Sequence, residues 1–314
     1  MRAQRARAWL AIAVALTALA TGCTGTTEAG APTPATTTPP DRATPTKSAA
    51  ASAAGEPSTA ASPTPIKIPR TFDPKHFVAG GSDVNPWQPM VPGLQTVARG
   101  FVTVGGRRIP HIKVTTLTEV TKKIDGVKTI LVLDQDFDDG QLTEQAIDYL
   151  AEDVGGNVWY LGSYTEAYEG GQFLNAQDAW LADVNGAAAG LYLPGDPKAG
   201  SPPYYQVQIP GGEQSTAQVV KVGAKTCVPF DCFDDVVVIE EGGAEHKYWA
   251  PAIGGVLTEP LSGSAQETEE LINVRELGAK ALAELSREAL RLDANAARTV
   301  PSVFGSSAPA VRER

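Results

Sequence analysis

Cysteine and histidine are scarce in this chain, whose 314 residues include three of each. So few ligands exclude a cysteine-rich zinc module and leave little material for a histidine-based metal centre. Basic residues are also in the minority, with 26 Lys and Arg against 36 Asp and Glu and a formal net charge of −10. Nucleic-acid binding requires a basic surface that neutralises phosphates, so this balance excludes a nucleic-acid partner.

A long hydrophobic run is also missing from the N-terminal region. The apolar stretch there covers only residues 8–20, whereas a transmembrane helix needs about 20 residues. Arg2, Arg5 and Arg7 precede it, and small residues follow it up to Gly22. This layout predicts a secretory signal peptide over residues 1–22.

The cysteine directly after this segment adds a more specific expectation. Gly22-Cys23 resembles the end of the lipobox of bacterial lipoproteins, although the leucine, Leu19, stands one residue earlier than usual. The resemblance implies that the Cys23 thiol is acylated, with palmitate among its lipids, and becomes the new N-terminus. The membrane partner is then this anchor, and the protein is extracytoplasmic, on the outer face of the cell membrane. The alternative is an ordinary signal peptide with an incidental cysteine.

Composition divides the remaining chain into four parts. Residues 23–69 hold the lipidated cysteine and a Thr/Ala/Pro-rich tether with almost no large apolar side chain, so we expect this tether to stay disordered. Residues 70–274 are rich in β-branched and aromatic residues and predict one β-rich domain. Residues 275–297 predict an amphipathic helix, and residues 298–314 a disordered tail.

Turn dipeptides divide the β-rich part into about a dozen short strands. Gly105-Gly106, Asp125-Gly126, Asp139-Gly140 and Gly170-Gly171 supply the positive φ of tight hairpins. Sequential hairpins predict a mainly β fold, an antiparallel meander that forms a curved sheet, an open barrel or a sandwich. In the segment that follows, Leu282, Leu285, Ala289 and Leu292 share one helical face. That face either packs on the domain or binds a partner.

Cys227 and Cys232 are separated by Val-Pro-Phe-Asp. Thiols are oxidised outside the cytoplasm, so the pair predicts a disulfide that closes a short loop before the strand at 233–241. A redox or metal pair is the alternative. The spacing is not that of a thioredoxin-type motif.

An acidic cluster at Asp134, Asp136 and Asp138 invites comparison with a calcium loop. The sixth position is Asp139 rather than glycine and the twelfth is Gln145 rather than glutamate, so it is not an EF-hand. We expect an acidic hairpin tip that turns at Asp139-Gly140. A non-EF-hand calcium site is the alternative, and no other cofactor is expected.

Aromatic residues gather in the second half of the chain. Strand alternation turns one set of them inward, either as core or as an aromatic surface for an apolar or sugar ligand. The candidate ligand-binding residues are Trp159, Tyr160, Trp180, Tyr248 and Trp249.

No catalytic residue can be assigned from sequence motifs. H-E-x-x-H, the G-x-S-x-G elbow and a Gly-rich phosphate loop are all missing. A triad that is assembled in space leaves no such motif. Whether the protein is an enzyme therefore stays open, with a non-enzyme favoured.

Several segments together resemble a family of uncharacterised secreted bacterial proteins, many of them lipoproteins. The segments are Asp139-Gly140-x-Leu142-x-Glu144, Gly156-Asn157-Val158-Trp159-Tyr160-x-Gly162 and Glu245-His246-Lys247-Tyr248-x-Ala250-Pro251-x-x-Gly254. The resemblance covers roughly residues 72–274 and implies a β-rich domain without an assigned activity. The last strand pair is also similar to strands in the curved half-barrel sheets of lipoprotein carriers, which is an analogy of fold.

These features predict a lipid-anchored cell-envelope protein that acts as a non-catalytic binding or interaction module. An apolar or glycolipid ligand, another glycan or an envelope protein is the expected partner. Two alternatives are an envelope hydrolase acting on glycan or ester, and a structural surface protein with calcium at the acidic hairpin.

Overall fold

The computed structural model describes residues 71–78, 83–261 and 267–313, which belong to one compact unit. The predicted signal peptide, Cys23 and the tether lie outside the described residues. No described helix is long and apolar enough to cross a membrane. After a short 3-10 helix at Pro74–His76, the elements are β1 Leu94–Val104, β2 Arg107–Ile124, β3 Val127–Asp138, β4 Gln141–Glu152, β5 Val158–Glu169, β6 Gln172–Leu181, β7 Gly190–Leu193, β8 Tyr204–Gln208, β9 Gln214–Cys227, β10 Cys232–Glu241, β11 Glu245–Ala250, β12 Gly254–Pro260, β13 Thr268–Glu276, α1 Ala279–Thr299, α2 Pro301–Phe304 and β14 Val311–Arg312.

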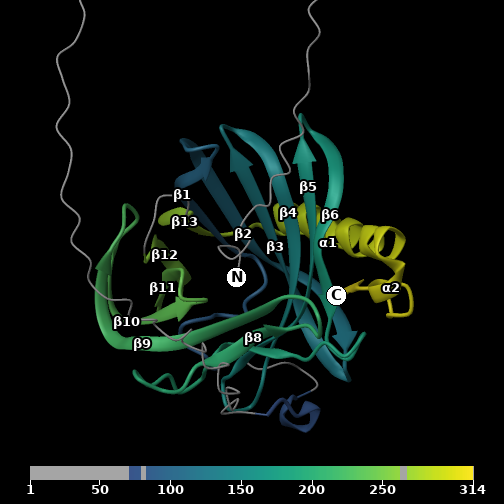
Figure 1. Cartoon of the computed structure of the whole chain (residues 1–314), viewed down its shortest axis with the longest axis horizontal. Helices are drawn as coiled ribbons and strands as arrows, with labels where there is room; N and C mark the ends of the chain where they lie inside the picture. Colours follow the sequence, from purple (N-terminus) through teal and green to yellow (C-terminus); the bar gives the residue numbers. More distant parts are fainter. Residues whose placement is uncertain (1–70, 79–82, 262–266, 314) are drawn as a thin grey trace, which may run out of the picture. The chain divides into compact units, whose positions relative to one another are not determined.

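The strands form one antiparallel sheet made of two meanders. Strands β1 to β6 are neighbours in sequence order, as are β8 to β13, and β1 pairs with β13 to join the two halves. The short strand β7 pairs with the start of β5, and β14 pairs with β2. The sheet is strongly curved, and its two halves face each other across its concave side (Figure 1). The predicted mainly β meander is confirmed, as a curved sheet that is not closed into a barrel.

The predicted turn dipeptides connect the hairpins of the first half. Asp125-Gly126 and Asp139-Gly140 have φ of 45° and 78°, and of 51° and 76°. Positive φ at both central residues matches the twist of the flanking strands, which tight hairpins require. The acidic segment after Asp134 therefore ends in a hairpin tip at Asp139-Gly140, as expected.

Strand alternation gives the sheet two different faces. On the concave face, Val132 and Leu150 of the first half lie across from Val237 and Ile239 of the second half in the same core. On the convex face of the first half, Tyr149 and its neighbours pack against the C-terminal helices. A separate small core lies on the convex face of the second half, built around Val236, Val238, Ala250, Val256 and Leu271.

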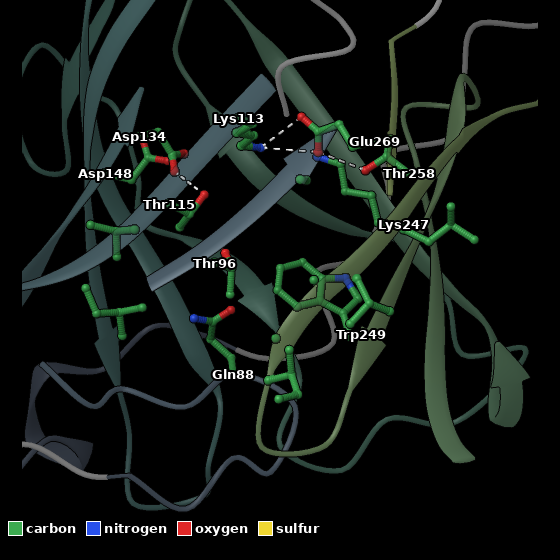
Figure 2. A pocket seen from close by; sticks show the side chains of 18 of the residues that line it. Gln88, Thr96, Lys113, Thr115, Asp134, Asp148, Lys247, Trp249, Thr258 and Glu269 are labelled. Atoms are coloured by element: carbon green, nitrogen blue, oxygen red, sulfur yellow. Dashed lines mark hydrogen bonds and ion pairs between the residues drawn. The ribbon is translucent and has the colours of Figure 1, made fainter. Parts of the chain in front are cut away.

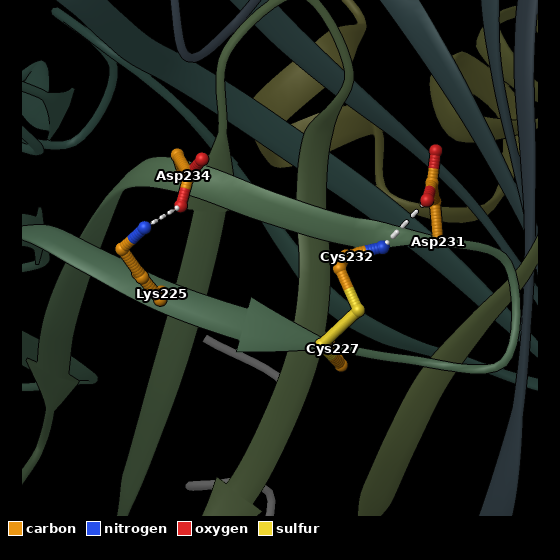
Figure 3. Close-up of a disulfide and its surroundings, with 5 residues drawn as sticks. All are labelled: Lys225, Cys227, Asp231, Cys232 and Asp234. Atoms are coloured by element: carbon orange, nitrogen blue, oxygen red, sulfur yellow. Dashed lines mark hydrogen bonds and ion pairs between the residues drawn. A yellow bond between two sulfur atoms is a disulfide. The ribbon is translucent and has the colours of Figure 1, made fainter.

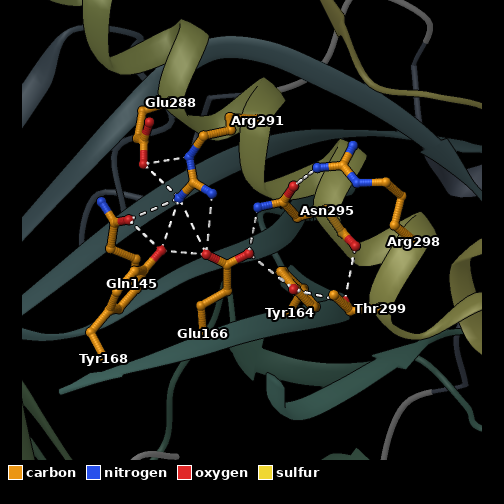
Figure 4. Close-up of polar contacts among 9 residues, drawn as sticks. All are labelled: Gln145, Tyr164, Glu166, Tyr168, Glu288, Arg291, Asn295, Arg298 and Thr299. Carbon is orange, nitrogen blue, oxygen red and sulfur yellow. Dashed lines mark hydrogen bonds and ion pairs between the residues drawn. The ribbon is translucent and has the colours of Figure 1, made fainter. Parts of the chain in front are cut away.

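Helix α1 packs its apolar seam onto the convex face of β2 to β6. Ala289, Leu292 and Ala296 are fully buried there, so the predicted amphipathic helix exists and covers the domain. One of its polar contacts with the sheet centres on Glu166, which is also fully buried. The other residues of this network are Gln145, Tyr164, Tyr168, Glu288, Arg291, Asn295 and Thr299 (Figure 4).

The segment after residue 298, where we expected a disordered tail, is instead part of the fold up to Glu313. Phe304 of α2 is buried between Tyr149 and Tyr164, with ring centroids 6.3 and 5.8 Å away. Ala310 donates its backbone N–H to Asp293 Oδ2 at 2.9 Å, and β14 then pairs with β2. The buried Phe304, the hydrogen bond to Asp293 and the pairing of β14 with β2 thus order a segment whose composition resembles a linker.

The predicted disulfide is present. Cys227 and Cys232 are directly paired residues of β9 and β10, with their Cα atoms 4.0 Å apart. The bond closes the hairpin loop at an exposed end of these strands (Figure 3).

Candidate functional site

The concave side of the sheet, called the hollow below, contains a cavity of about 110 Å³. Residues from both halves of the sheet line this cavity. Strands β1 to β4 provide one wall, and strands β11 to β13 with the loop at Gln88 provide the other (Figure 2). The polar and aromatic lining residues are Gln88, Thr96, Lys113, Thr115, Asp134, Asp148, Tyr192, Lys247, Trp249, Thr258 and Glu269. Polar groups on rigid strands around a concave space are typical of a ligand site.

The charged groups of the lining are fixed by neighbouring side chains. Lys113 Nζ lies 3.3 Å from Glu269 Oε1, and Thr258 donates to Glu269 Oε2 at 3.3 Å. On the wall formed by β1 to β4, Thr115 of β2 donates to Asp134 Oδ1 of β3 at 2.5 Å. These charges stay inside the hollow because each one has a polar partner on another strand.

Asp148 connects the charged lining to the aromatic part of the hollow. Its Oδ1 accepts hydrogen bonds from the hydroxyls of Tyr160 at 2.7 Å and Ser163 at 2.9 Å. Tyr160, Tyr192 and Trp249 follow one another, with ring centroids 6.0 and 5.4 Å apart and the second contact edge-on. A carboxylate beside an aromatic wall offers both polar and apolar contacts to one ligand.

The structure places the five predicted aromatic residues at different sites. Trp249 lines the cavity, and Tyr160 lies behind it against Asp148. Trp180 packs edge-on against Tyr160 in the core. Trp159 is also buried and donates to Asp153 Oδ2 at 2.9 Å. Tyr248 is on the convex face, where its hydroxyl donates to Glu259.

The three predicted calcium ligands lie on one face of β3 but do not converge on one point. Alternate residues of a strand are about 6.6 Å apart, so Asp134 and Asp138 are about 13 Å apart along it. Asp134 accepts from Thr115, and Asp138 Oδ1 lies 2.8 Å from His111 Nδ1. These three carboxylates therefore do not form the compact shell of oxygen ligands that calcium requires.

Potential ligand atoms gather more closely around His111 of β2. One ligand atom each from His111, Glu267 and Glu269 lies within 4.8 Å of the others. However, His111 is enclosed by Asp138 on one nitrogen and by Glu267, 2.8 Å away, on the other. Burial alone would lower its pKa, but these carboxylates raise the pKa of His111 to about 10. With this pKa the imidazole is protonated at neutral pH and does not act there as a general base.

Lys247 is the cation of the opposite wall. Its Nζ lies 2.8 Å from Glu241 Oε2 and 3.2 Å from Glu245 Oε1. Burial acts to lower the pKa of Lys247, but the two carboxylates raise it well above its usual value. The ammonium is thus a permanent charge beside the cavity.

The sequence analysis did not select Lys113, Lys247 or Glu269. The available signal was a charged residue between apolar residues of a predicted strand, such as Lys113 between Ile112 and Val114. Such a residue can be recognised as a candidate only when it is known which face of the strand points inward.

Comparisons with known proteins add little to this site. No family model and no curated protein matches the chain. A crystal structure from Parabacteroides distasonis, of a protein provisionally assigned as a lipoprotein, covers 62% of this chain and all of its own. The two are 11% identical and superpose with a TM-score of 0.34, which is too low to support an argument about function.

Proposed function

We propose that this protein is a non-catalytic binding protein of the cell envelope, anchored through Cys23, whose ligand occupies the concave hollow. The observation that carries the proposal is the cavity itself. Charged groups from both halves of the sheet line it and are held by neighbouring strands, as in a preformed binding site.

The lining favours a polar ligand or headgroup over an acyl chain. At about 110 Å³ the cavity is smaller than the roughly 300–1,000 Å³ of most ligand pockets. Two carboxylates, Asp134 and Asp148, and the indole of Trp249 face into it. A glycolipid headgroup or a small hydroxylated molecule fits these groups better than an apolar chain.

Native mass spectrometry of the full chain, purified in mild detergent from a host with a cell envelope, tests the proposal. We expect a stoichiometric adduct that organic or aqueous extraction releases. The variant Ala98→Leu enlarges a lining residue and should lose the adduct, whereas Ala199→Leu, on an exposed loop, should keep it. A clean mass for the unmodified chain would count against the proposed function.

A further inference from the structure

A second group of side chains lies beside the cavity, where strands β2, β1 and β13 are neighbours in the sheet. The register places His111 of β2 opposite Gly100 of β1, and Gly100 opposite Glu269 of β13. Neighbouring strands are about 4.8 Å apart, so two strand spacings separate His111 from Glu269. Because Gly100 has no side chain, His111 Nε2 reaches to within 3.9 Å of Glu269 Oε1 across it.

Three potential ligands converge in this group, which we call the His111 site: His111, Glu267 and Glu269. One ligand atom of each lies within 4.8 Å of the others. Protein ligands lie about 2.0–2.2 Å from a zinc ion, so two ligands of one ion are roughly 3–4 Å apart. Nε2 is 2.8 Å from Glu267 Oε1 and 3.9 Å from Glu269 Oε1, which brackets this separation.

The imidazole nitrogen that faces the two glutamates makes no hydrogen bond. His111 Nε2 is completely buried and has no hydrogen-bond partner among the described residues, although Glu267 Oε1 is only 2.8 Å away. At so short a distance a hydrogen bond fails only when the acceptor lies off the N–H direction. Buried polar atoms usually have a partner. An oxygen beside the N–H direction rather than along it is the arrangement of two ligands that share one ion.

The surrounding contacts hold these ligands in the way that metal sites do. The other imidazole nitrogen, Nδ1, lies 2.8 Å from Asp138 Oδ1. A metal-binding histidine almost always donates its second N–H to such a group. Glu269 is held by Lys113 at 3.3 Å and by the hydroxyl of Thr258 at 3.3 Å (Figure 2). His111 and Glu269 are therefore oriented before an ion arrives.

We propose that His111, Glu267 and Glu269 bind a divalent transition-metal ion, for which zinc is the best match. An imidazole with two carboxylates suits zinc, whereas calcium takes about six to eight oxygen ligands. In the metal-free protein a proton occupies Nε2, and the ion takes its place. Three protein ligands leave one position of a tetrahedral zinc ion open. Glu269 also lines the cavity, so this position is available to water or to the ligand of the hollow.

Isothermal titration with zinc tests this site on the full chain in mild detergent, after EDTA has removed bound metals. We expect one zinc ion per chain and at least tenfold weaker binding of calcium. His111→Gln should weaken zinc binding at least tenfold. His246→Gln is the matched control, because His246 of β11 is not part of the His111 site, and it should leave the affinity unchanged.

Glu267→Gln keeps the test valid if His111→Gln fails to fold. Glu267 precedes β13 and its side chain is 16% exposed, so the substitution does not alter the buried core. It should also weaken zinc binding at least tenfold. Glu270→Gln, at an exposed position of β13, should bind zinc as the wild type does.

The possible results are decisive for the metal site and separate it from the proposed function. Absence of zinc binding, or wild-type affinity in both His111→Gln and Glu267→Gln, overturns the site. Calcium binding as tight as zinc binding overturns it too, because it would indicate oxygen ligands alone. A zinc ion and an organic ligand differ in mass, so native mass spectra of the same samples report on the two proposals independently.

Discussion

Lys122 of β2 lies with its Nζ 2.9 Å from Oδ1 of Asp293 on α1, and both side chains are almost completely buried. The same carboxylate accepts the hydroxyl of Tyr149 at 2.7 Å and the backbone N–H of Ala310 at 2.9 Å. Asp293 of α1 therefore connects the helix to the sheet and to the C-terminal segment.

The first prediction concerns this contact. Asp293→Ala should lower the free energy of unfolding by about 3–5 kcal/mol, because it leaves the Lys122 ammonium buried without a counter-charge. Adding Lys122→Met to that variant should restore part of the loss. Urea unfolding of the wild type, the two single variants and the double variant measures the coupling. Additive losses would contradict the role given to the ion pair.

The second prediction concerns the seam between the two meanders. Gly100 of β1 lies opposite Glu269 of β13, and a Cβ there would stand 1.5 Å from the carbonyl oxygen of Thr268. Gly100→Ala should therefore force the strands apart and cost about 1–3 kcal/mol or more. Gly255→Ala is the matched control, since its Cβ would meet only Trp249, at 3.9 Å. Equal thermal midpoints for the two variants would show that β1 and β13 accommodate the added methyl group without a loss of stability.

The strands could be predicted well because local rules set them. Paired turn residues with positive φ fix the hairpins of the first half, so the predicted turns at Asp125-Gly126 and Asp139-Gly140 separate β2 from β3 and β3 from β4. The strand β7 and the C-terminal segment were missed. Gly190–Leu193 is short and pairs with distant β5, and the segment after residue 298 is ordered by Phe304 and Asp293 rather than by its own composition.

The site was less accessible to sequence reasoning. Alternation correctly turned Trp249 inward, but it could not distinguish a core tryptophan such as Trp180 from a cavity-lining one. Lys247, Glu241 and Glu245 lie on the neighbouring strands β10 and β11. They are ordinary charged residues in the sequence and become unusual only through their burial.

The third prediction concerns the disulfide. Cys227 and Cys232 close a short loop between strands that are already paired. Loop-closure entropy for so few residues predicts that Cys227→Ser with Cys232→Ser costs about 2 kcal/mol. Guanidinium unfolding of the double variant measures this loss, and the native adduct should be retained. Failure of the double variant to fold would show that the bond does more than close the loop.

The fourth prediction is a pH dependence that comes from His111. Its pKa is raised to about 10 by Asp138 and Glu267, with Asp136 and Glu269 also facing it. Because the pKa is higher in the folded than in the unfolded state, about 6.5, the stabilisation is fully present below pH 6.5. It declines as the pH rises towards 10.

The measurement is the free energy of unfolding between pH 7 and 9.5. The wild type should lose up to about 1.4 kcal/mol for each pH unit through this one group. His111→Gln should start lower and have a flatter profile, because glutamine does not titrate. Parallel profiles for the two proteins would mean that the imidazole is not held as a cation.

The last prediction concerns Trp249, which lines the cavity. Its indole N–H has no described acceptor, so Trp249→Phe removes no hydrogen bond inside the protein. The variant should lose one hydrogen bond to the ligand, about 1 kcal/mol or less, which is up to about fivefold in affinity. Tyr248→Phe is the neighbouring control, because its hydroxyl points to Glu259 on the other face. Native mass spectrometry at fixed protein concentration should show less adduct on Trp249→Phe and full occupancy on Tyr248→Phe. Full occupancy on both would place the ligand away from the indole and move the site towards the charged wall of Lys113 and Glu269.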